Sequence, residues 1–107
     1  MEKSSHRLSP TVLAIQRHRL LRILDTVDTD SRRAHVERES PSKRINRLRY
    51  AGSIPFEVGC LMLVVLSYRN RAEYEGNLPS GNAAAAVFFA MAAIEDWFST
   101  FIPAQAV

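Results

Sequence analysis

The side chains of this sequence that most often carry chemistry are three histidines, one cysteine and a carboxylate beside an apolar run. The histidines are His6, His18 and His35, and none has a cysteine or another histidine at the spacing of a metal site. His35 is close in sequence to Glu37, but both belong to a polar segment in which charged residues meet by chance. We therefore predict no metal site and no catalytic histidine.

Cys60 and Glu57 are the other two candidates, and each has a structural explanation. Cys60 lies within the apolar residues 58–66, where we expect a buried structural thiol, because a nucleophilic thiolate needs a partly exposed, electropositive setting. Glu57 falls in the first turn of the expected helix, where the helix dipole favours a negative charge. The glycines form neither a phosphate-binding loop nor a dinucleotide fingerprint. We predict no catalytic residues, no cofactor and no enzymatic activity.

The segment of residues 32–49 offers a different chemistry, because a run of positive charge can neutralise phosphates. It holds seven basic residues against two acidic ones. The basic residues are Arg32, Arg33, Arg38, Lys43, Arg44, Arg47 and Arg49. The segment lacks interleaved aromatic residues, and no helix-turn-helix pattern surrounds it, so a solvated face is the commoner meaning of such a run. A small basic helical regulator that binds nucleic acid is therefore the alternative function.

Length and composition indicate a single globular domain over residues 1–107, with 47% hydrophobic and 23% charged residues. One cysteine cannot form an intrachain disulfide, and the polar N-terminus does not resemble a signal peptide, so we expect a cytoplasmic protein. No apolar stretch reaches the roughly 18 residues of a membrane span. Residues 1–50 hold 12 basic and 6 acidic residues, whereas residues 51–107 hold 2 and 5. The first half is thus the solvated one, and the second half supplies most of the core.

The elements that must position any functional side chain are predicted to be helices. The first is expected over Pro10–Val27, with Ser9 as its N-cap and an apolar stripe at helical spacing. The stripe comprises Val12, Gln16, Leu20, Ile23, Leu24 and Val27. Residues 30–41 are polar and read as a loop or a solvated helical turn. A short helix over residues 43–50, capped by Ser42, is expected to close at Gly52 in the left-handed conformation.

The last two predicted helices form an antiparallel hairpin over residues 53–101. The first of them is capped by Ser53 and runs to about residue 75, and its middle is apolar on every side, which predicts burial on every side. The second is expected over residues 83–101, with Pro103 ending it. The predicted fold class is all-α: a small helical domain with a C-terminal hairpin, in which residues 1–8 and 28–42 are candidates for flexible segments.

The apolar inventory exceeds what three packed helices can cover, which predicts an oligomer or partner interface. A two-fold dimer through the hairpin is the simplest solution. We expect the self-association surface to include Leu61, Val65, Phe89 and Trp97. The first helix is expected either to cover its own core or to lie in a partner's groove. For the second case the predicted contact residues are Leu13, Arg17, Leu20, Leu21 and Leu24.

Residues 51–57 read Ala-Gly-Ser-Ile-Pro-Phe-Glu and lead into an apolar helix, a turn and an alanine-rich helix. This pattern resembles the "AG-x-IPFE" start of the hairpin in QslA-like proteins, small pseudomonad quorum-sensing anti-activators. The resemblance covers residues 51–101. It implies a dimeric helical protein that binds the ligand-binding domain of a LuxR-type transcription factor, LasR, and prevents its dimerisation and DNA binding. It implies no enzymatic step and assigns no individual functional residue.

Overall fold

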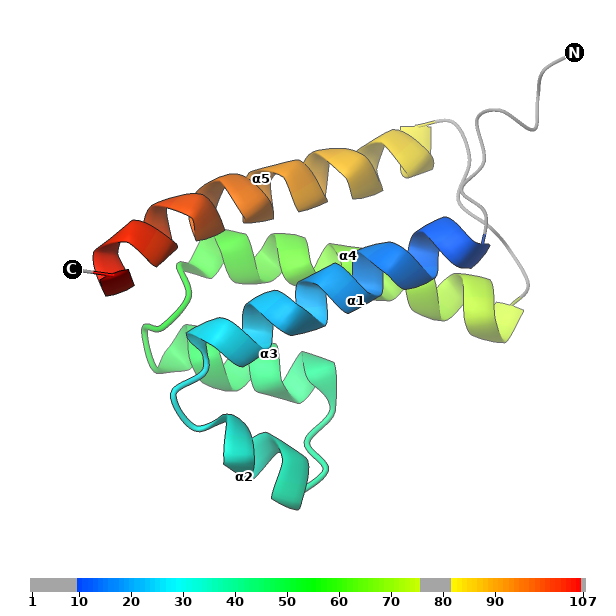
Figure 1. The fold of residues 1–107 in the computed structure, drawn as a ribbon. Helices are drawn as coiled ribbons and strands as arrows, with labels where there is room; N and C mark the ends of the chain where they lie inside the picture. Colours follow the sequence, from blue (N-terminus) through cyan, green and yellow to red (C-terminus); the bar gives the residue numbers. More distant parts are fainter. Residues whose placement is uncertain (1–9, 76–81, 107) are drawn as a thin grey trace, which may run out of the picture.

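In the computed structural model, residues 10–75 and 82–106 are described, and their regular secondary structure is entirely helical (Figure 1). The helices are α1 (Pro10–Val27), α2 (Ser31–Val36), α3 (Pro41–Tyr50), α4 (Phe56–Glu75) and α5 (Asn82–Ala106). The predicted all-α fold class is confirmed. In these described ranges no helix combines the length and the apolar character that crossing a membrane requires.

Helix α1 has the bounds that its capping residues and apolar stripe predict. Its stripe is buried except for the half-buried Val12. Leu20 and Leu24 are fully enclosed, and the amide of Gln16 is also buried within the stripe. The polar residues His18, Arg19 and Arg22 lie on the exposed side of the helix. This division follows directly from the 3.6-residue period of the apolar positions.

The polar segment after α1 forms the short helix α2, and α3 begins two residues earlier than the sequence predicts. The N-cap of α3 is Ser40, whose hydroxyl accepts a hydrogen bond from the backbone N–H of Lys43 at 3.3 Å. The choice of Ser42 as cap was wrong, because Pro41 is favoured at the first helical position and so makes the residue before it the cap. Gly52 closes α3 with a φ of 80°, as predicted.

Helix α4 is central, because it packs against α1, α3 and α5 (Figure 1). Figure 1 shows α4 and α5 side by side in opposite directions, whereas α1 and α5 run in the same direction. The connection between α4 and α5, residues 76–81, and the N-terminal residues 1–9 lie outside the described residues. The core is built from α1, α3, α4, α5 and the segment between α3 and α4. Its members include Leu20, Leu24, Ile45, Leu48, Ile54, Met62, Val65, Met91 and Ile94.

A glycine permits the close approach of α3 and α4. A Cβ at residue 59 would overlap the aliphatic carbons of Arg49, so only glycine leaves room for this side chain. The guanidinium of Arg49 then lies 4.0 Å from the ring centroid of Phe56, in a cation–π contact.

Three predictions about the hairpin are wrong. Helix α4 begins at Phe56, and the backbone N–H of Gly59 donates to the carbonyl of Pro55, so Pro55 and not Ser53 directly precedes the helix. Residues 58–66 are not buried on all sides, because the neighbouring helices leave one face of α4 open, and Cys60 and Val64 are exposed there beside Phe56. Helix α5 does not end before Pro103 but continues to Ala106. A proline removes one backbone hydrogen bond from a helix, and here that loss does not stop the last turns.

We expect Leu24→Ala to lower the free energy of unfolding by about 2–5 kcal/mol, because the enclosed side chain leaves a cavity when it is truncated. The control is Val36→Ala on α2, at a side chain that is 72% exposed, and it should change stability by no more than about 0.5 kcal/mol. Urea denaturation followed by circular dichroism measures both. Equal losses in the two variants would contradict the core described here.

Candidate functional site

The most elaborate polar arrangement in the described residues is a buried ion-pair network that joins α1, α3 and the segment between α2 and α3. Its centre is Asp28, whose side chain is 1% exposed. Asp28 Oδ2 accepts hydrogen bonds from Arg44 Nε and Arg47 Nη2, both at 2.8 Å. Arg47 also donates to both carboxylate oxygens of Glu39, at 2.8 and 2.9 Å. Arg38, left-handed with a φ of 53°, turns the chain just before Glu39.

This environment holds the pKa of Asp28 well below the usual range of an aspartate. Burial is the largest single influence and raises the pKa, but hydrogen bonds from Arg47, Arg44 and the backbone of Asp30 together outweigh it. The pKa of Glu39 is also lowered, chiefly by its hydrogen bonds from Arg47. The hydrogen bonds to Glu39 and Asp28 in turn raise the pKa of Arg47. The network is therefore fully ionised at neutral pH.

The network reduces the number of unpaired cations in the basic segment of residues 32–49. Arg44 and Arg47 are held by carboxylates, Arg33 pairs with Glu37 at 3.4 Å, and Arg49 packs on α4. In the described part of the chain, the remaining three basic residues have no recorded ion pair. These are Arg32, Arg38 and Lys43. The segment thus offers phosphates far fewer cations than its sequence suggests, which weakens the nucleic-acid alternative.

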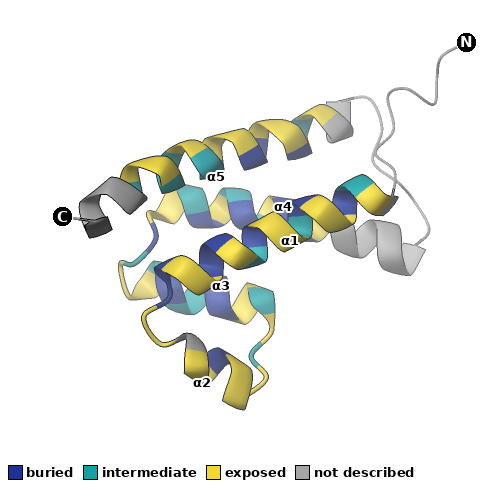
Figure 2. Cartoon of the chain, viewed as in Figure 1, coloured by how far each residue is buried: buried dark blue, intermediate teal, exposed yellow. Residues whose placement is uncertain are grey.

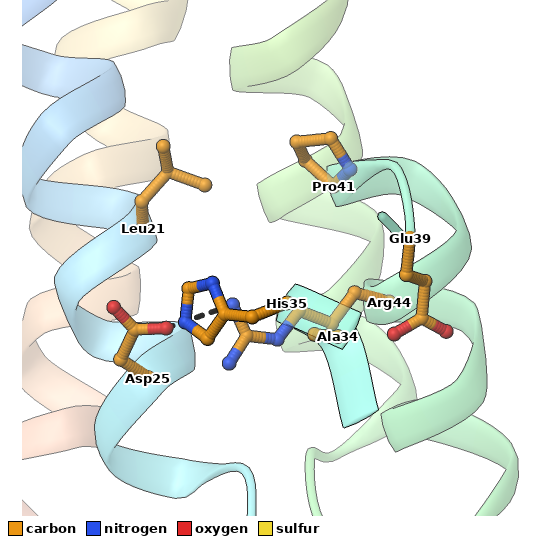
Figure 3. Close-up of a pocket in the computed structure, with 7 residues that line it drawn as sticks. All are labelled: Leu21, Asp25, Ala34, His35, Glu39, Pro41 and Arg44. Carbon is orange, nitrogen blue, oxygen red and sulfur yellow. Dashed lines mark ion pairs between the residues drawn. The ribbon is translucent and has the colours of Figure 1, made fainter. Parts of the chain in front are cut away.

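A pocket of about 170 Å³ lies beside the network, between α1, α2 and α3 (Figure 3). It is lined by Leu21, Asp25, Ala34, His35, Glu39, Pro41 and Arg44. His35 extends from α2 toward Asp25, whose Oδ1 accepts from Arg44 Nη1 at 2.9 Å. Both carboxylates of the pocket are thus already paired with an arginine. Arg44 Nη2 is buried and has no hydrogen-bond partner.

The chemistry available in this pocket is limited. It contains no serine, cysteine or lysine nucleophile, and its carboxylates are neutralised by guanidinium groups. Within residues 10–75 and 82–106, no three His, Cys, Asp or Glu side chains are grouped so that they could hold a metal ion. We therefore interpret the pocket as a structural feature of the contact between α1 and α3.

The exposed apolar side chains form the other candidate site. Two adjacent aromatic residues of α5, Phe88 and Phe89, are 48% and 76% exposed, and the outward side of α5 is exposed along its described length (Figure 2). Alanines 85, 92 and 93 surround them. On α1, Ile15 is 49% exposed. Surfaces of this composition are typical of protein interfaces.

Phe88 and Phe89 lie on different sides of α5. Phe88 lies two turns before Glu95, which pairs with Arg19, so Phe88 is on the side of α5 that faces α1. Phe89 is in line with Ala93 and Trp97 at spacings of four residues, on the other side. The ring of Trp97 is half-buried and lies 5.7 Å from the ring of Phe101. The exposed apolar surface of α5 therefore extends from Phe88, on the side facing α1, around the helix to Phe89.

The structure divides the residues that the sequence proposed for partner binding. Leu13, Leu20 and Leu24 are buried in the monomer, which agrees with the alternative that α1 covers its own core. Arg17 and Leu21 are half-buried. These five residues do not form one open surface, because only one side of α1 faces solvent.

The four residues predicted for self-association also differ in how far they are exposed. Val65 is buried, Leu61 and Trp97 are half-buried at the edge of the core, and Phe89 is exposed. Cys60 is exposed, so its expected burial was wrong. Ile15 and Phe88 were missed. For Ile15 a signal existed, since it does not belong to the apolar stripe of its helix.

In comparisons with known proteins, no family model matches this chain, and no curated protein and no solved structure matches it.

We expect Asp28→Asn to lower the free energy of unfolding at pH 7 by about 3 kcal/mol, because Arg44 and Arg47 lose a buried counter-charge. Asp30→Asn is the control, since the exposed Asp30 makes no side-chain cap hydrogen bond, and its effect should stay within about 0.5 kcal/mol. Urea denaturation measures both.

The same network makes stability depend on pH. The folded-state pKa values of Asp28 and Glu39 are depressed, so their contribution is present above about pH 4 and is lost as the pH falls through the folded values. The unfolding free energy of the unsubstituted protein should fall between about pH 5 and pH 2, and that of Asp28→Asn should fall less. Equal acid sensitivity would contradict the network's role.

Proposed function

We propose that this chain is a non-enzymatic regulatory protein that acts by binding another protein. The observation that carries the proposal is the pair Phe88 and Phe89, two adjacent aromatic side chains left exposed on α5 beside exposed alanines. Aromatic residues are enriched at interfaces, where burying them contributes a large share of the binding energy. The described pocket supports the same reading, because its carboxylates are paired with arginines rather than free for proton transfer.

The partner that we propose is the ligand-binding domain of a LuxR-type transcription factor. The support is the resemblance of residues 51–101 to the QslA-like anti-activators together with the exposed apolar surface of α5. An anti-activator of this kind competes with the receptor's own dimer interface. Such interfaces are apolar at their centre, so the competitor needs exposed apolar side chains. Binding would prevent receptor dimerisation and hence DNA binding.

We further propose that the chain itself is a homodimer and that the two sides of α5 have separate tasks. The Phe89 side is assigned to self-association, together with Leu61 and Trp97, which are half-buried at the edge of the core. The Phe88 side, which faces α1, is assigned to the partner. A two-fold dimer needs one self-complementary apolar patch, and the Phe89 side is the one that we assign to it.

Phe89→Asp should convert the dimer into a monomer, because it places a charge at the centre of the apolar contact. Val36→Asp is a matched control, since the same charge is introduced at an equally exposed apolar side chain on α2. Light scattering on a sizing column gives the mass of each variant. A monomeric unsubstituted protein, or a Phe89→Asp variant that stays dimeric, would overturn the proposed dimer.

Mixing the protein with a LuxR-type ligand-binding domain should give a mixed complex and remove the receptor's own dimer. The same sizing measurement reports both changes. If the receptor dimer persists and no mixed complex forms, the LuxR-type partner is wrong. Tight binding to duplex DNA that falls steeply with salt would instead support the nucleic-acid alternative.

A further inference from the structure

A groove of about 300 Å³ runs between α1 and α5 on the side away from α2 and α3. It is lined by Arg19, Arg22, Ile23, Thr26, Glu95 and Phe98. The ion pair between Arg19 and Glu95 joins the two helices across it. Helices α1 and α5 run in the same direction along the groove (Figure 1).

The ion pair between Arg19 and Glu95 indicates which residues of α1 and α5 lie opposite each other. Ile15 lies one turn before Arg19 on α1, and Phe88 lies two turns before Glu95 on α5, so both half-exposed side chains lie before the ion pair, outside the residues that line the groove. Ile23, which is 5% exposed, and the half-buried Phe98 follow the ion pair and line the groove itself. The surface that runs from Ile15 and Phe88 past the ion pair into the groove is therefore apolar at its two ends and polar in the middle.

The spacing of the apolar ends suits a helix. Ile15 and Ile23 are eight residues apart, which is about 12 Å at the helical rise of 1.5 Å per residue. Residues seven or eight apart on a partner helix span the same distance and share one face. An amphipathic helix laid into the groove can thus place one apolar side chain at each end.

The charge of the groove selects among such helices. Of the arginines of α1, Arg19 and Arg22 line the groove, and the one acidic residue of α1, Asp25, is paired with Arg44 outside it. Arg19 is neutralised by Glu95. Arg22 lines the groove, and no carboxylate of the described residues is recorded as its partner. A carboxylate on the bound helix would complement this positive charge.

We propose that the groove between α1 and α5 binds an acidic amphipathic helix of a protein partner. Two apolar side chains of that helix, two turns apart, occupy the ends marked by Ile15 with Phe88 and by Ile23 with Phe98. A carboxylate on its flank pairs with Arg22. The inference rests on the proposed function and adds to it the chemistry of the partner segment.

The test uses a fluorescently labelled synthetic helical peptide with a leucine stripe flanked by glutamates and with alanine elsewhere. The control peptide is the same sequence with every glutamate replaced by lysine. Fluorescence anisotropy at low salt should show the acidic peptide binding the unsubstituted protein at least about tenfold more tightly than the basic one. Ile15→Asp should abolish binding, and Arg22→Glu should reverse the preference between the two peptides.

Arg32→Glu is the matched control, because it makes the same charge change at an exposed residue of α2, outside the groove. It should leave the preference for the acidic peptide in place. If Arg32→Glu and Arg22→Glu weaken binding equally, the effect is one of overall charge, and the groove proposal is wrong. Circular dichroism checks that each variant keeps its helical content.

The outcome also separates this inference from the proposed function. If the acidic peptide does not bind but a LuxR-type domain does, the partner segment is wrong and the proposed function stands. If neither binds, both are wrong. If Ile15→Asp and Arg22→Glu turn a dimer into a monomer, a second copy of the chain occupies the groove, and the proposal is overturned.

Discussion

The arrangement of the N-terminal helices depends on one buried carboxylate. Asp28 follows directly after α1, and two arginines of α3 close on it from the opposite side. The contacts join residues 16 and 19 positions apart and fix the end of α1 against α3. A buried charge of this kind is tolerated only because its partners are buried with it. Since α4 packs on both helices, the position of α1 on the core follows from this contact, and with it the groove that α1 forms with α5.

The same interaction divides the positive charge of the chain into structural and available parts. Arg44 and Arg47 are neutralised inside the fold, although they belong to the most basic segment of the sequence. The arginines of α1 lie outside the network, and Arg22 has no recorded carboxylate partner among the described residues. Among the side chains that the structure describes, cations with neither a recorded ion pair nor a cation–π contact therefore remain in two places, at Arg17 and Arg22 on α1 and at Arg32, Arg38 and Lys43 in residues 32–49. The network removes Arg44 and Arg47 from the charge that either kind of partner could use.

Some apolar side chains of α4 and α5 remain exposed because no other helix covers them. Three helices surround α4 and leave one of its faces open, and α5 has neighbours on its inner side alone. Each open face retains apolar side chains that the monomer does not cover, among them Val64 on α4 and Phe89 on α5. Exposed aromatic residues add nothing to the stability of the monomer, so a contact with another protein chain is the explanation that we propose for them.

The sequence by itself determined the all-α class, the bounds of α1 and the left-handed Gly52, because capping residues, helical periodicity and backbone freedom act within a few residues. Only the tertiary structure decided which side of α4 stays open, which arginines are neutralised and that Leu20 and Leu24 belong to the core. These features depend on which helices meet in space. Contacts between positions far apart in the chain leave no local pattern in a single sequence, and that is why the pairing of Asp28 with Arg44 and Arg47 was not predicted.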